Sequence, residues 1–423
     1  MKQFLIICAL FISINGYSQA IKRLADRAKQ KVENVAGNKV DGAIDNAANG
    51  KGTKKAGNEN GADTESDDEE SVTTKPKSEG LQAYSRYDFV PGEKVIAFDN
   101  FERAEIGDFP TNWNTNGSAE VVTVNMKEGK WMKINNSGYF HAEFIKNIPD
   151  NSTLEFDLGV NNNFQWVSSN IYVYLTHVKE NGNFSDPGYY DHALHFEFHP
   201  LTGGGQTSGG VQFRTSRGTA NLSNHNKISN WDNKSNLFAH VSLWRQGQRL
   251  RMYINGNKIF DLPKAFETNS NYTDLIFATH DIQKDKGDYY LLGNIRLATG
   301  APDTRNKLVT EGKWVTRGIL FDVNSDKLKP ESFGTLKEIA GVLKDNPSIK
   351  VKIVGHTDSD GDDKANFELS KKRAAAVKSA LVKEFGIDEG NLETDGKGEG
   401  EPVDKNTTSE GKANNRRVEF IKM

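Results

Sequence analysis

The 423-residue chain contains a single cysteine, Cys8, which lies inside an apolar run near its start. The rest of the chain therefore has no thiol with which to form a disulfide or carry a lipid. No later apolar stretch approaches the ~20 residues of a membrane-spanning helix, so we predict no transmembrane segment in the mature chain. The net charge of −3 gives no overall attraction to nucleic acid, and we predict no nucleic-acid partner.

The first 83 residues have the patterns of export and spacing segments. A lysine, the apolar run Phe4–Ile14 and small polar residues up to Ala20 predict a signal peptide at residues 1–20. Residues 21–49 place small apolar residues at helical spacing opposite basic ones, and two interpretations stay open: a spacer, or a basic amphipathic helix on a membrane surface. Residues 50–83 have few apolar side chains, which predicts a disordered linker.

Residues 84–302 alternate short apolar and polar runs between turn signals, which is typical of an all-β region. Gln246-Gly247 and Asn255-Gly256 divide the segment Leu243–Pro263 into three predicted antiparallel strands, because such pairs favour tight turns. Many short strands without helical runs predict a β-sandwich. Residues 98–117 and the hairpin around Asn255-Gly256 resemble concanavalin- and laminin-G-type jelly rolls. That resemblance implies a jelly-roll sandwich with a glycan or protein ligand.

Glu155 and Asp157 share one face of the predicted strand STLEFDLGV. Retaining glycoside hydrolysis needs two carboxyl groups about 5 Å apart. Jelly-roll endoglucanases place a second glutamate further along such a strand, but Gly159 and Val160 follow here. We therefore predict no hydrolytic site at this strand.

The stretch HFEFH places three potential metal ligands on one face of a strand and two phenylalanines on the other. Same-face neighbours are about 6.5–7 Å apart, which is wide for shared coordination. We predict a polar face there, with no metal and no cofactor. The aromatic residues of this region either stack on sugars or belong to the core, and both interpretations stay open for Trp166, Tyr172, Tyr174, Tyr189 and Tyr190.

Residues 303–423 alternate strand-like and helix-like patterns. WVTRGILF, IKVKIVG and RRVEFIK are strand-like, whereas PESFGTLKEIAGVLKDN and NFELSKKRAAAVKSALVKEF are helical. Pro330 suits the first turn of the first of these helices. The buried stripe of that helix is formed by Leu336, Ile339, Ala340 and Leu343. The alternation predicts an α/β sandwich of the βαβαβ type.

Asp358 follows the strand IKVKIVG, at the carboxyl end where α/β folds often carry ligand sites. Arg373 recurs at every fourth position with Leu369, Val377 and Leu381, so its guanidinium lies in line with core residues and needs a partner. Two alternatives stay open: an internal Asp358–Arg373 ion pair, or two groups that flank a ligand. Such a pair matches the ammonium and carboxylate of an amino acid.

The stretch Lys313–Met423 resembles the OmpA-like C-terminal domain. The similarity lies in ILFDVNSDKL, GHTDSDGDDKANFELSKKRAAAV, GKGEGEP and SEGKANNRRVEF, which follow the family's order and spacing. The resemblance implies noncovalent binding of peptidoglycan, in which an aspartate and an arginine clasp the diaminopimelate of the stem peptide. It places the peptidoglycan-binding residues at Asp358, Arg373, Asn324, Asn366 and Arg416. Asp360 stands where many members have threonine, and the resulting acidic loop suits a cationic ammonium.

We therefore expect a multidomain, non-enzymatic protein of the cell envelope. Its OmpA-like part would bind peptidoglycan, and its jelly roll would present a second surface for a glycan or a protein. The signal peptide predicts export to the periplasm, with association to the outer membrane and cell wall. The alternative is an exported glycan-active hydrolase whose OmpA-like domain only localises it.

Overall fold

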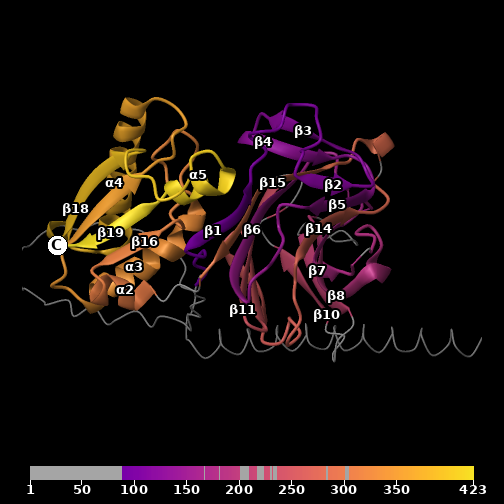
Figure 1. Ribbon diagram of the computed structural model, residues 1–423, viewed down its shortest axis with the longest axis horizontal. Coiled ribbons are helices and arrows are strands. Elements are labelled where there is room, and N and C mark those ends of the chain that lie inside the picture. Colours follow the sequence, from indigo (N-terminus) through magenta and orange to yellow (C-terminus); the bar gives the residue numbers. More distant parts are fainter. Residues whose placement is uncertain are drawn as a thin grey trace, which may run out of the picture. The chain divides into compact units, whose positions relative to one another are not determined.

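The computed structural model of this chain describes residues 88–165, 167–180, 182–200, 209–216, 223–228, 231, 236–282, 284–300 and 304–423. The predicted signal peptide, the spacer or helix at 21–49 and the linker at 50–83 lie outside these residues. All described residues belong to one compact unit, residues 83–423. A mainly β part extends to residue 300, and an α/β part begins at residue 304 (Figure 1).

The β part consists of two antiparallel sheets. The eight-stranded sheet has the order β13 (Asn257–Leu262), β12 (Arg249–Ile254), β11 (Phe238–Gln246), β6 (Asn151–Val160), β15 (Tyr290–Thr299), β4 (Lys127–Ile134) and β3 (Ala119–Val124), with β1 (Lys94–Asp99) also paired to β15. The seven-stranded sheet has the order β10 (Ser223–Ile228), β9 (Gly209–Ser216), β8 (Tyr190–His199), β7 (Ile171–Val178), β14 (Asp274–Thr279), β5 (Gly138–Ala142) and β2 (Trp113–Thr115). The prediction of a mainly β region is confirmed, and the jelly-roll assignment stays a prediction.

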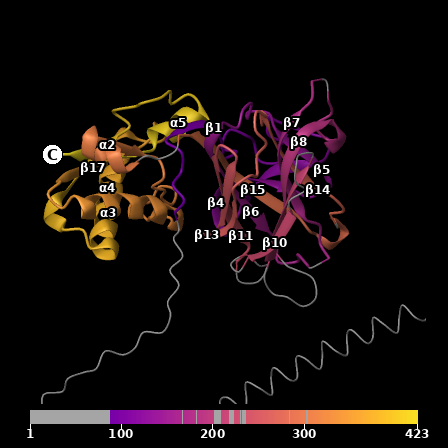
Figure 2. The same ribbon diagram turned by 90° about the horizontal axis from the view of Figure 1, so that it is seen from below.

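The two sheets pack face to face around one apolar core (Figures 1 and 2). Every second residue of Leu154–Val160 in β6 points into this core and is at most 3 % exposed. Phe156 of β6 meets Phe277 of β14 edge-on, with ring centroids 5.3 Å apart. Because side chains alternate along a strand, Glu155 and Asp157 lie on the outer face of the eight-stranded sheet.

Both predicted tight turns are present in the β part. Gln246 of β11 pairs with Arg249 of β12, and the intervening Gly247 has a φ of 59°. Asn255 and Gly256, with φ values of 48° and 80°, join β12 to β13. The three consecutive antiparallel strands predicted from these pairs are confirmed.

The α/β part is built on a four-stranded sheet in the order β16 (Lys313–Thr316), β19 (Val418–Lys422), β17 (Val351–His356) and β18 (Leu392–Gly398). Helices α2 (Thr304–Thr310), α3 (Phe333–Asp345) and α4 (Asp363–Phe385) share its apolar core, and α5 (Ser409–Asn415) precedes β19. Short 3-10 helices lie at Pro187–Tyr189 (η1), Lys284–Lys286 (η2), Pro330–Ser332 (η3) and Glu389–Asn391 (η4). Pro330 thus begins η3, which leads into α3.

The sheet has one strand more than the predicted βαβαβ pattern. Strand β18 was not predicted, because its sequence LETDGKG lacks alternating apolar residues. Its glycines instead allow helix α4 to approach the sheet closely. A Cβ atom on Gly396 would lie 2.4 Å from Ser370 Oγ, and one on Gly398 would lie 2.9 Å from the backbone nitrogen of Phe367.

Strand β1 of the sandwich is hydrogen-bonded to helix α5 of the α/β part. The side chain of Asn414 accepts a hydrogen bond from the backbone N–H of Val95 and donates one to its carbonyl, each at 3.0 Å. Lys307 of α2 pairs with Glu93 at 2.7 Å, and Arg317 donates to the Glu93 carbonyl. These contacts hold the two parts together.

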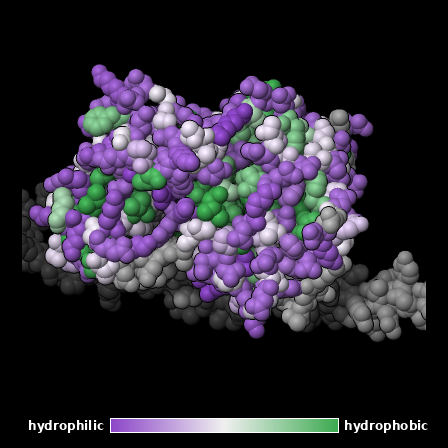
Figure 3. All heavy atoms as spheres, viewed as in Figure 1, coloured by the Kyte–Doolittle hydropathy of each residue, from purple (hydrophilic) through white to green (hydrophobic). Residues whose placement is uncertain are grey.

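Within the part of the chain that the structure describes, no helix is long and apolar enough to cross a membrane. Hydrophilic residues dominate the face drawn in Figure 3, and hydrophobic residues lie there in separate patches.

Candidate binding site

Asp358 lies in the loop that joins strand β17 to helix α4, and it is 7 % exposed. Helix α4 begins after Asp362, whose side chain accepts a hydrogen bond from the N–H of Ala365 and caps the helix. Gly355 allows the strand to pass close to the helix, because a Cβ there would lie 2.3 Å from the Ser370 carbonyl oxygen. This close packing fixes where the loop emerges.

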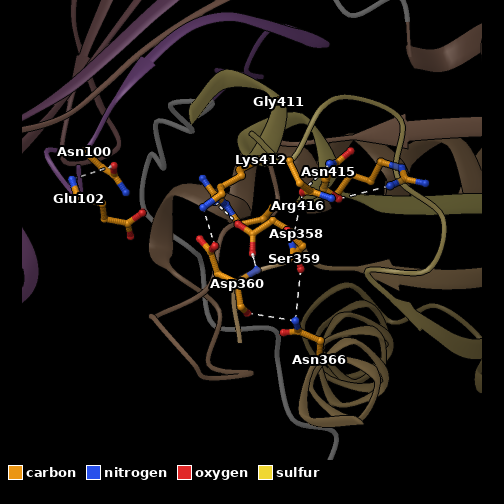
Figure 4. A network of polar contacts seen from close by, with 12 residues as sticks. Asn100, Glu102, Asp358, Ser359, Asp360, Asn366, Gly411, Lys412, Asn415 and Arg416 are labelled. Carbon is orange, nitrogen blue, oxygen red and sulfur yellow. Dashed lines mark hydrogen bonds and ion pairs between the residues drawn. The ribbon is translucent and has the colours of Figure 1, made fainter. Parts of the chain in front are cut away.

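The carboxylate of Asp358 forms an ion pair with Arg416, which follows helix α5 (Figure 4). Its other oxygen accepts a hydrogen bond from the backbone N–H of Asp360 at 3.2 Å. The guanidinium of Arg416 also lies 5.4 Å from the ring centroid of Phe98 in β1. Arg416 therefore connects the loop of Asp358 to the sandwich.

Arg373 of helix α4 is half-buried and donates hydrogen bonds to two backbone carbonyls, Ser325 at 2.9 Å and Asp322 at 3.4 Å. Its guanidinium lies 4.9 Å from the ring centroid of Phe321. Burial, followed by the neighbouring charge of Arg416, lowers the pKa of Arg373 to about 10. The side chain stays cationic at neutral pH, and no carboxylate among the described residues forms a salt bridge with it.

Asp358 and Arg373 line one cavity of about 300 Å³. The internal Asp358–Arg373 ion pair, one of the two alternatives from the sequence, is wrong, because Arg416 takes that place at the carboxylate. The helical spacing of Arg373 does place it near core residues, since Val377 and Leu381 are fully buried. The other alternative was that Asp358 and Arg373 flank a ligand. Their position around one cavity is compatible with that alternative.

Asn324, Asn366 and Arg416 also line this cavity, but they differ in what they contact. Asn324 is exposed, with a φ of 49°, in the turn that precedes η3. Asn366 is 6 % exposed, and its amide donates to the carbonyls of Asp358 and Asp360 and to the carboxylate of Glu399. The amide of Asn366 thus fixes the shape of the loop.

The acidic charges of the loop are distributed over neighbouring groups. Asp360 pairs with Lys412 of α5 at 2.5 Å (Figure 4). Asp362 caps helix α4, and Asp363 lies in its first turn, where a negative charge is favourable. Asp358 is the buried carboxylate of the loop that faces the cavity.

The outer face of the eight-stranded sheet contributes a buried charged network to the same cavity. Arg296 of β15 donates to Glu155 at 2.5 Å. Asp157 accepts hydrogen bonds from His240 Nδ1 and Asn294, each at 2.6 Å. Burial alone would raise the pKa of Glu155 and of Asp157, but Arg296 and His240 outweigh it and lower both values.

The pKa of His240 predicts a pH dependence of stability. Burial would lower this pKa, but the carboxylates of Asp157 and Glu155 raise it well above the usual value of about 6.5. The contribution of the imidazolium to stability is therefore complete below about pH 6.5 and is lost as the pH rises through the raised value. We expect the unfolding temperature to fall more steeply between about pH 6 and pH 9 in the wild type than in His240→Gln, measured by calorimetry. Equal slopes would contradict this prediction.

The other candidates in the sandwich fall into separate environments. Phe196 and Phe198 are fully buried in the core, as the alternation of HFEFH predicts. His195 lies 3.7 Å from Glu197, whereas His199 bonds the Ser168 carbonyl at 2.9 Å. Among the described residues, no three His, Cys, Asp or Glu side chains are close enough to hold a metal ion.

The predicted aromatic residues are partly core and partly surface. Tyr174 and Tyr190 are 7 % and 2 % exposed, whereas Tyr172 is half-buried and Tyr189 is exposed. Trp166 lies outside the described residues.

Several cavity residues were not predicted from the sequence. They are Arg317 and Lys329 of the α/β part, and His240, Asn294 and Arg296 of the sandwich. One signal was present: Arg296 interrupts the apolar strand LLGNIRLAT in the way that Arg373 interrupts an apolar helical stripe. A buried guanidinium in such a position needs partners, and here the partner is Glu155.

The fold and the site together define a two-part protein, with a β-sandwich and a small α/β domain whose loop of Asp358 lines a charged cavity. Residues 320–416 match the OmpA family. YfiB of Escherichia coli, described as a lipoprotein, is 37% identical over 113 residues, which are 26% of this chain and 71% of that protein. The chain therefore belongs to the OmpA family.

Other relatives match over a similar length of the chain. Outer membrane porin F of Pseudomonas aeruginosa is 42% identical over 111 residues, which are 26% of this chain and 32% of porin F. The chain spans a third to a half of the length of porin F and of several other relatives. The crystal structure of the peptidoglycan-associated lipoprotein from Burkholderia pseudomallei is 30% identical, covers 25% of this chain and 88% of that one, and has a TM-score of 0.24.

Proposed function

We propose that this protein binds peptidoglycan noncovalently in the bacterial cell envelope, through the cavity that contains Asp358 and Arg373. The observation that carries the proposal is Arg373. It is a half-buried cation with backbone carbonyls as its hydrogen-bond partners, and it lines the same cavity as a buried carboxylate. A ligand with a carboxylate and an ammonium complements both groups, and the diaminopimelate of the stem peptide has them.

Recognition works by exchange of ion pairs. The ligand ammonium approaches Asp358, whose charge is balanced by Arg416 until then. The ligand carboxylate accepts paired hydrogen bonds from the planar guanidinium of Arg373, a geometry that favours arginine over lysine. The amide of Asn366 holds the loop so that Asp358 is in place before the ligand arrives.

We further propose that the protein is exported and acts in the periplasm, associated with the cell wall and the outer membrane. Relatives in the family include an outer membrane porin and an outer-membrane lipoprotein, which supports this placement. The predicted signal peptide would direct the export.

The protein acts without catalysis in this proposal. A hydrolase that uses Glu155 and Asp157 would need one protonated carboxyl group with a raised pKa. Both pKa values are instead lowered by Arg296 and His240. A further carboxylate at position 159 has no space, because a Cβ there would lie 2.9 Å from the ring of Phe238.

The sandwich offers a second binding surface, for a glycan, on the outer face of its seven-stranded sheet. The rings of Tyr172 and Tyr174 stack with a centroid distance of 6.5 Å. His280 lies 5.0 Å from Tyr172 and 5.5 Å from Tyr139. The rings of Tyr139 and Tyr172 are half-buried, whereas Tyr174 is buried beside them. Partly exposed aromatic rings beside a polar side chain suit the apolar faces and hydroxyl groups of sugars.

Sedimentation with purified peptidoglycan sacculi tests the anchoring function. We expect the wild-type protein to sediment, and Asp358→Asn to bind roughly tenfold to a hundredfold more weakly, because a charge-assisted contact is lost. The matched control is Asp345→Asn, which removes the same charge from the exposed end of helix α3 and should sediment like the wild type. A wild-type protein that stays in solution, or an Asp358→Asn variant that sediments like it, would overturn the proposal.

A further inference from the structure

A second cavity, of about 240 Å³, adjoins the cavity that contains Asp358 and Arg373. The residues that line both cavities are Phe98, Asn100, Glu102, Asp360 and Arg416. The lining of the second cavity also includes Arg103, Ser409 and Lys412. The second cavity therefore lies between the segment that ends strand β1 of the sandwich and helix α5 of the α/β part.

Direct contacts connect the second cavity to Asp358. The backbone N–H of Asp360 donates to the Asp358 carboxylate at 3.2 Å, and the Asp360 carboxylate pairs with Lys412 at 2.5 Å (Figure 4). In addition, Arg416 forms an ion pair with Asp358, and its guanidinium lies 5.4 Å from the ring centroid of Phe98. A ligand ammonium at Asp358 would therefore lie within two side-chain contacts of this cavity.

Positive charge exceeds negative charge in the second cavity. Its charged residues are the cations Arg103, Lys412 and Arg416 and the acids Glu102 and Asp360. The guanidinium of Arg103 is exposed and donates to the backbone carbonyl of Thr407. No carboxylate among the described residues forms a salt bridge with Arg103. Because a guanidinium has five N–H groups, Arg103 has donors left for a ligand.

Binding of the ligand at Asp358 changes the charge balance around Arg416. In the proposed exchange of ion pairs, the ligand ammonium replaces Arg416 at the Asp358 carboxylate. The side chain of Arg416 is 35 % exposed and lies against the ring of Phe98, so the loss of its carboxylate partner costs free energy unless another anion replaces it. A ligand with a second carboxylate in the second cavity supplies that anion.

The stem peptide has such a carboxylate next to diaminopimelate. The preceding residue is a glutamate that is linked through its side-chain carboxyl group, so its α-carboxylate takes no part in a peptide bond. A volume of about 240 Å³ corresponds to roughly eight water molecules at about 30 Å³ each, which is enough for one amino-acid residue. The neighbouring residue of the peptide thus matches the neighbouring cavity in size and in charge.

We propose that the second cavity is a subsite for the glutamate that precedes diaminopimelate, with its α-carboxylate bound between Arg103 of the sandwich and Arg416 of the α/β part. The peptide-linked end of diaminopimelate then points toward the second cavity. The sandwich contributes to recognition through Arg103, and the protein prefers stem peptides in which this carboxylate is charged to those in which it is amidated. This inference rests on the proposed peptidoglycan function.

Calorimetric titration of the full chain with two matched probes tests the inference. The probes are L-alanyl-γ-D-glutamyl-meso-diaminopimelate and the same tripeptide with the glutamate α-carboxylate converted to an amide. We expect the wild type to bind the acidic tripeptide roughly tenfold more tightly, because the amide forms no ion pair with either arginine. In Arg103→Gln this preference should fall to about threefold or less, since Arg416 alone remains. The affinity for free meso-diaminopimelate should stay unchanged, because Arg103 lies outside the clasp.

Arg249→Gln is the matched control, since Arg249 is another exposed arginine of the sandwich, and this variant should keep the full preference. Added salt should reduce the preference of the wild type, because ion pairs near the surface are screened. A wild type that binds both tripeptides equally, or an Arg103→Gln variant with the full preference, would overturn the inference. The anchor function would then still stand if Asp358→Asn weakens binding to sacculi. A wild type that binds neither the tripeptides nor sacculi would overturn the anchor function and the inference with it.

Discussion

Replacement of Arg373 by methionine should weaken binding to peptidoglycan severely and leave the free energy of unfolding nearly unchanged. Two charge-assisted hydrogen bonds to the ligand carboxylate are lost, so we expect affinity to fall by roughly a hundredfold or more. The free energy of unfolding should change little, because two effects oppose each other. The variant loses the hydrogen bonds from Arg373 to two backbone carbonyls, which destabilises the fold. It also no longer buries a cation that has no salt-bridge partner among the described residues, which stabilises the fold. The free energy of unfolding should change by less than about 1 kcal/mol.

The measurement combines sedimentation with sacculi and urea unfolding of the same preparations. Arg249→Met is the matched control, since Arg249 is an exposed arginine of the sandwich that pairs with Asp261 at 2.7 Å. It removes an equal positive charge and should sediment like the wild type. If Arg373→Met binds sacculi normally, Arg373 is a structural residue and the clasp is wrong.

Substitution of Gly411 by alanine should cause the largest loss of stability in the α/β part. A Cβ atom at Gly411 would lie 1.9 Å from the backbone oxygen of Lys405, and that backbone cannot move without disturbing the start of α5. Overpacking of this kind costs about 3 kcal/mol or more. Because Arg416 follows α5 directly, binding of peptidoglycan should weaken as well.

Gly341→Ala is the control for this substitution. Gly341 lies within helix α3, and nothing lies within 4 Å of its added Cβ. Alanine there should stabilise the protein by about 0.5–1 kcal/mol, since glycine loses more backbone entropy in a helix. Calorimetric unfolding of the two variants should therefore give shifts of opposite sign. A Gly411→Ala variant at least as stable as the wild type would show that the packing around Gly411 is looser than the structure describes.

Local patterns made much of the fold predictable. The Asn255-Gly256 pair identified a hairpin because its positive φ angles depend on two adjacent residues. The stripe of Leu336 to Leu343 identified α3 because burial follows the helical period. Strand β18 escaped prediction since its glycines serve contact with α4, and that requirement belongs to a distant segment.

The site was predictable to the same extent. The position of Asp358 after a strand and of Arg373 in an apolar stripe indicated charged groups near one space. The partner of Asp358 was not predictable, because Arg416 is 58 residues away and reaches it through α5 and β19. The wall of Glu155 and His240 lies on another sheet, and no local pattern relates that sheet to the loop of Asp358.

The attachment between strand β1 and helix α5 has a consequence for how this protein can evolve. Asn414 bonds the main-chain N–H and carbonyl of Val95, groups that stay the same whichever side chain position 95 carries. Substitutions at position 95 therefore leave the backbone partners of these two hydrogen bonds in place. The bonds depend on the identity of one side chain, Asn414, and not on two side chains that must change together. The sandwich and the α/β part can therefore diverge in sequence while the two Asn414 bonds to Val95 are kept, whereas the Lys307–Glu93 pair needs both of its side chains.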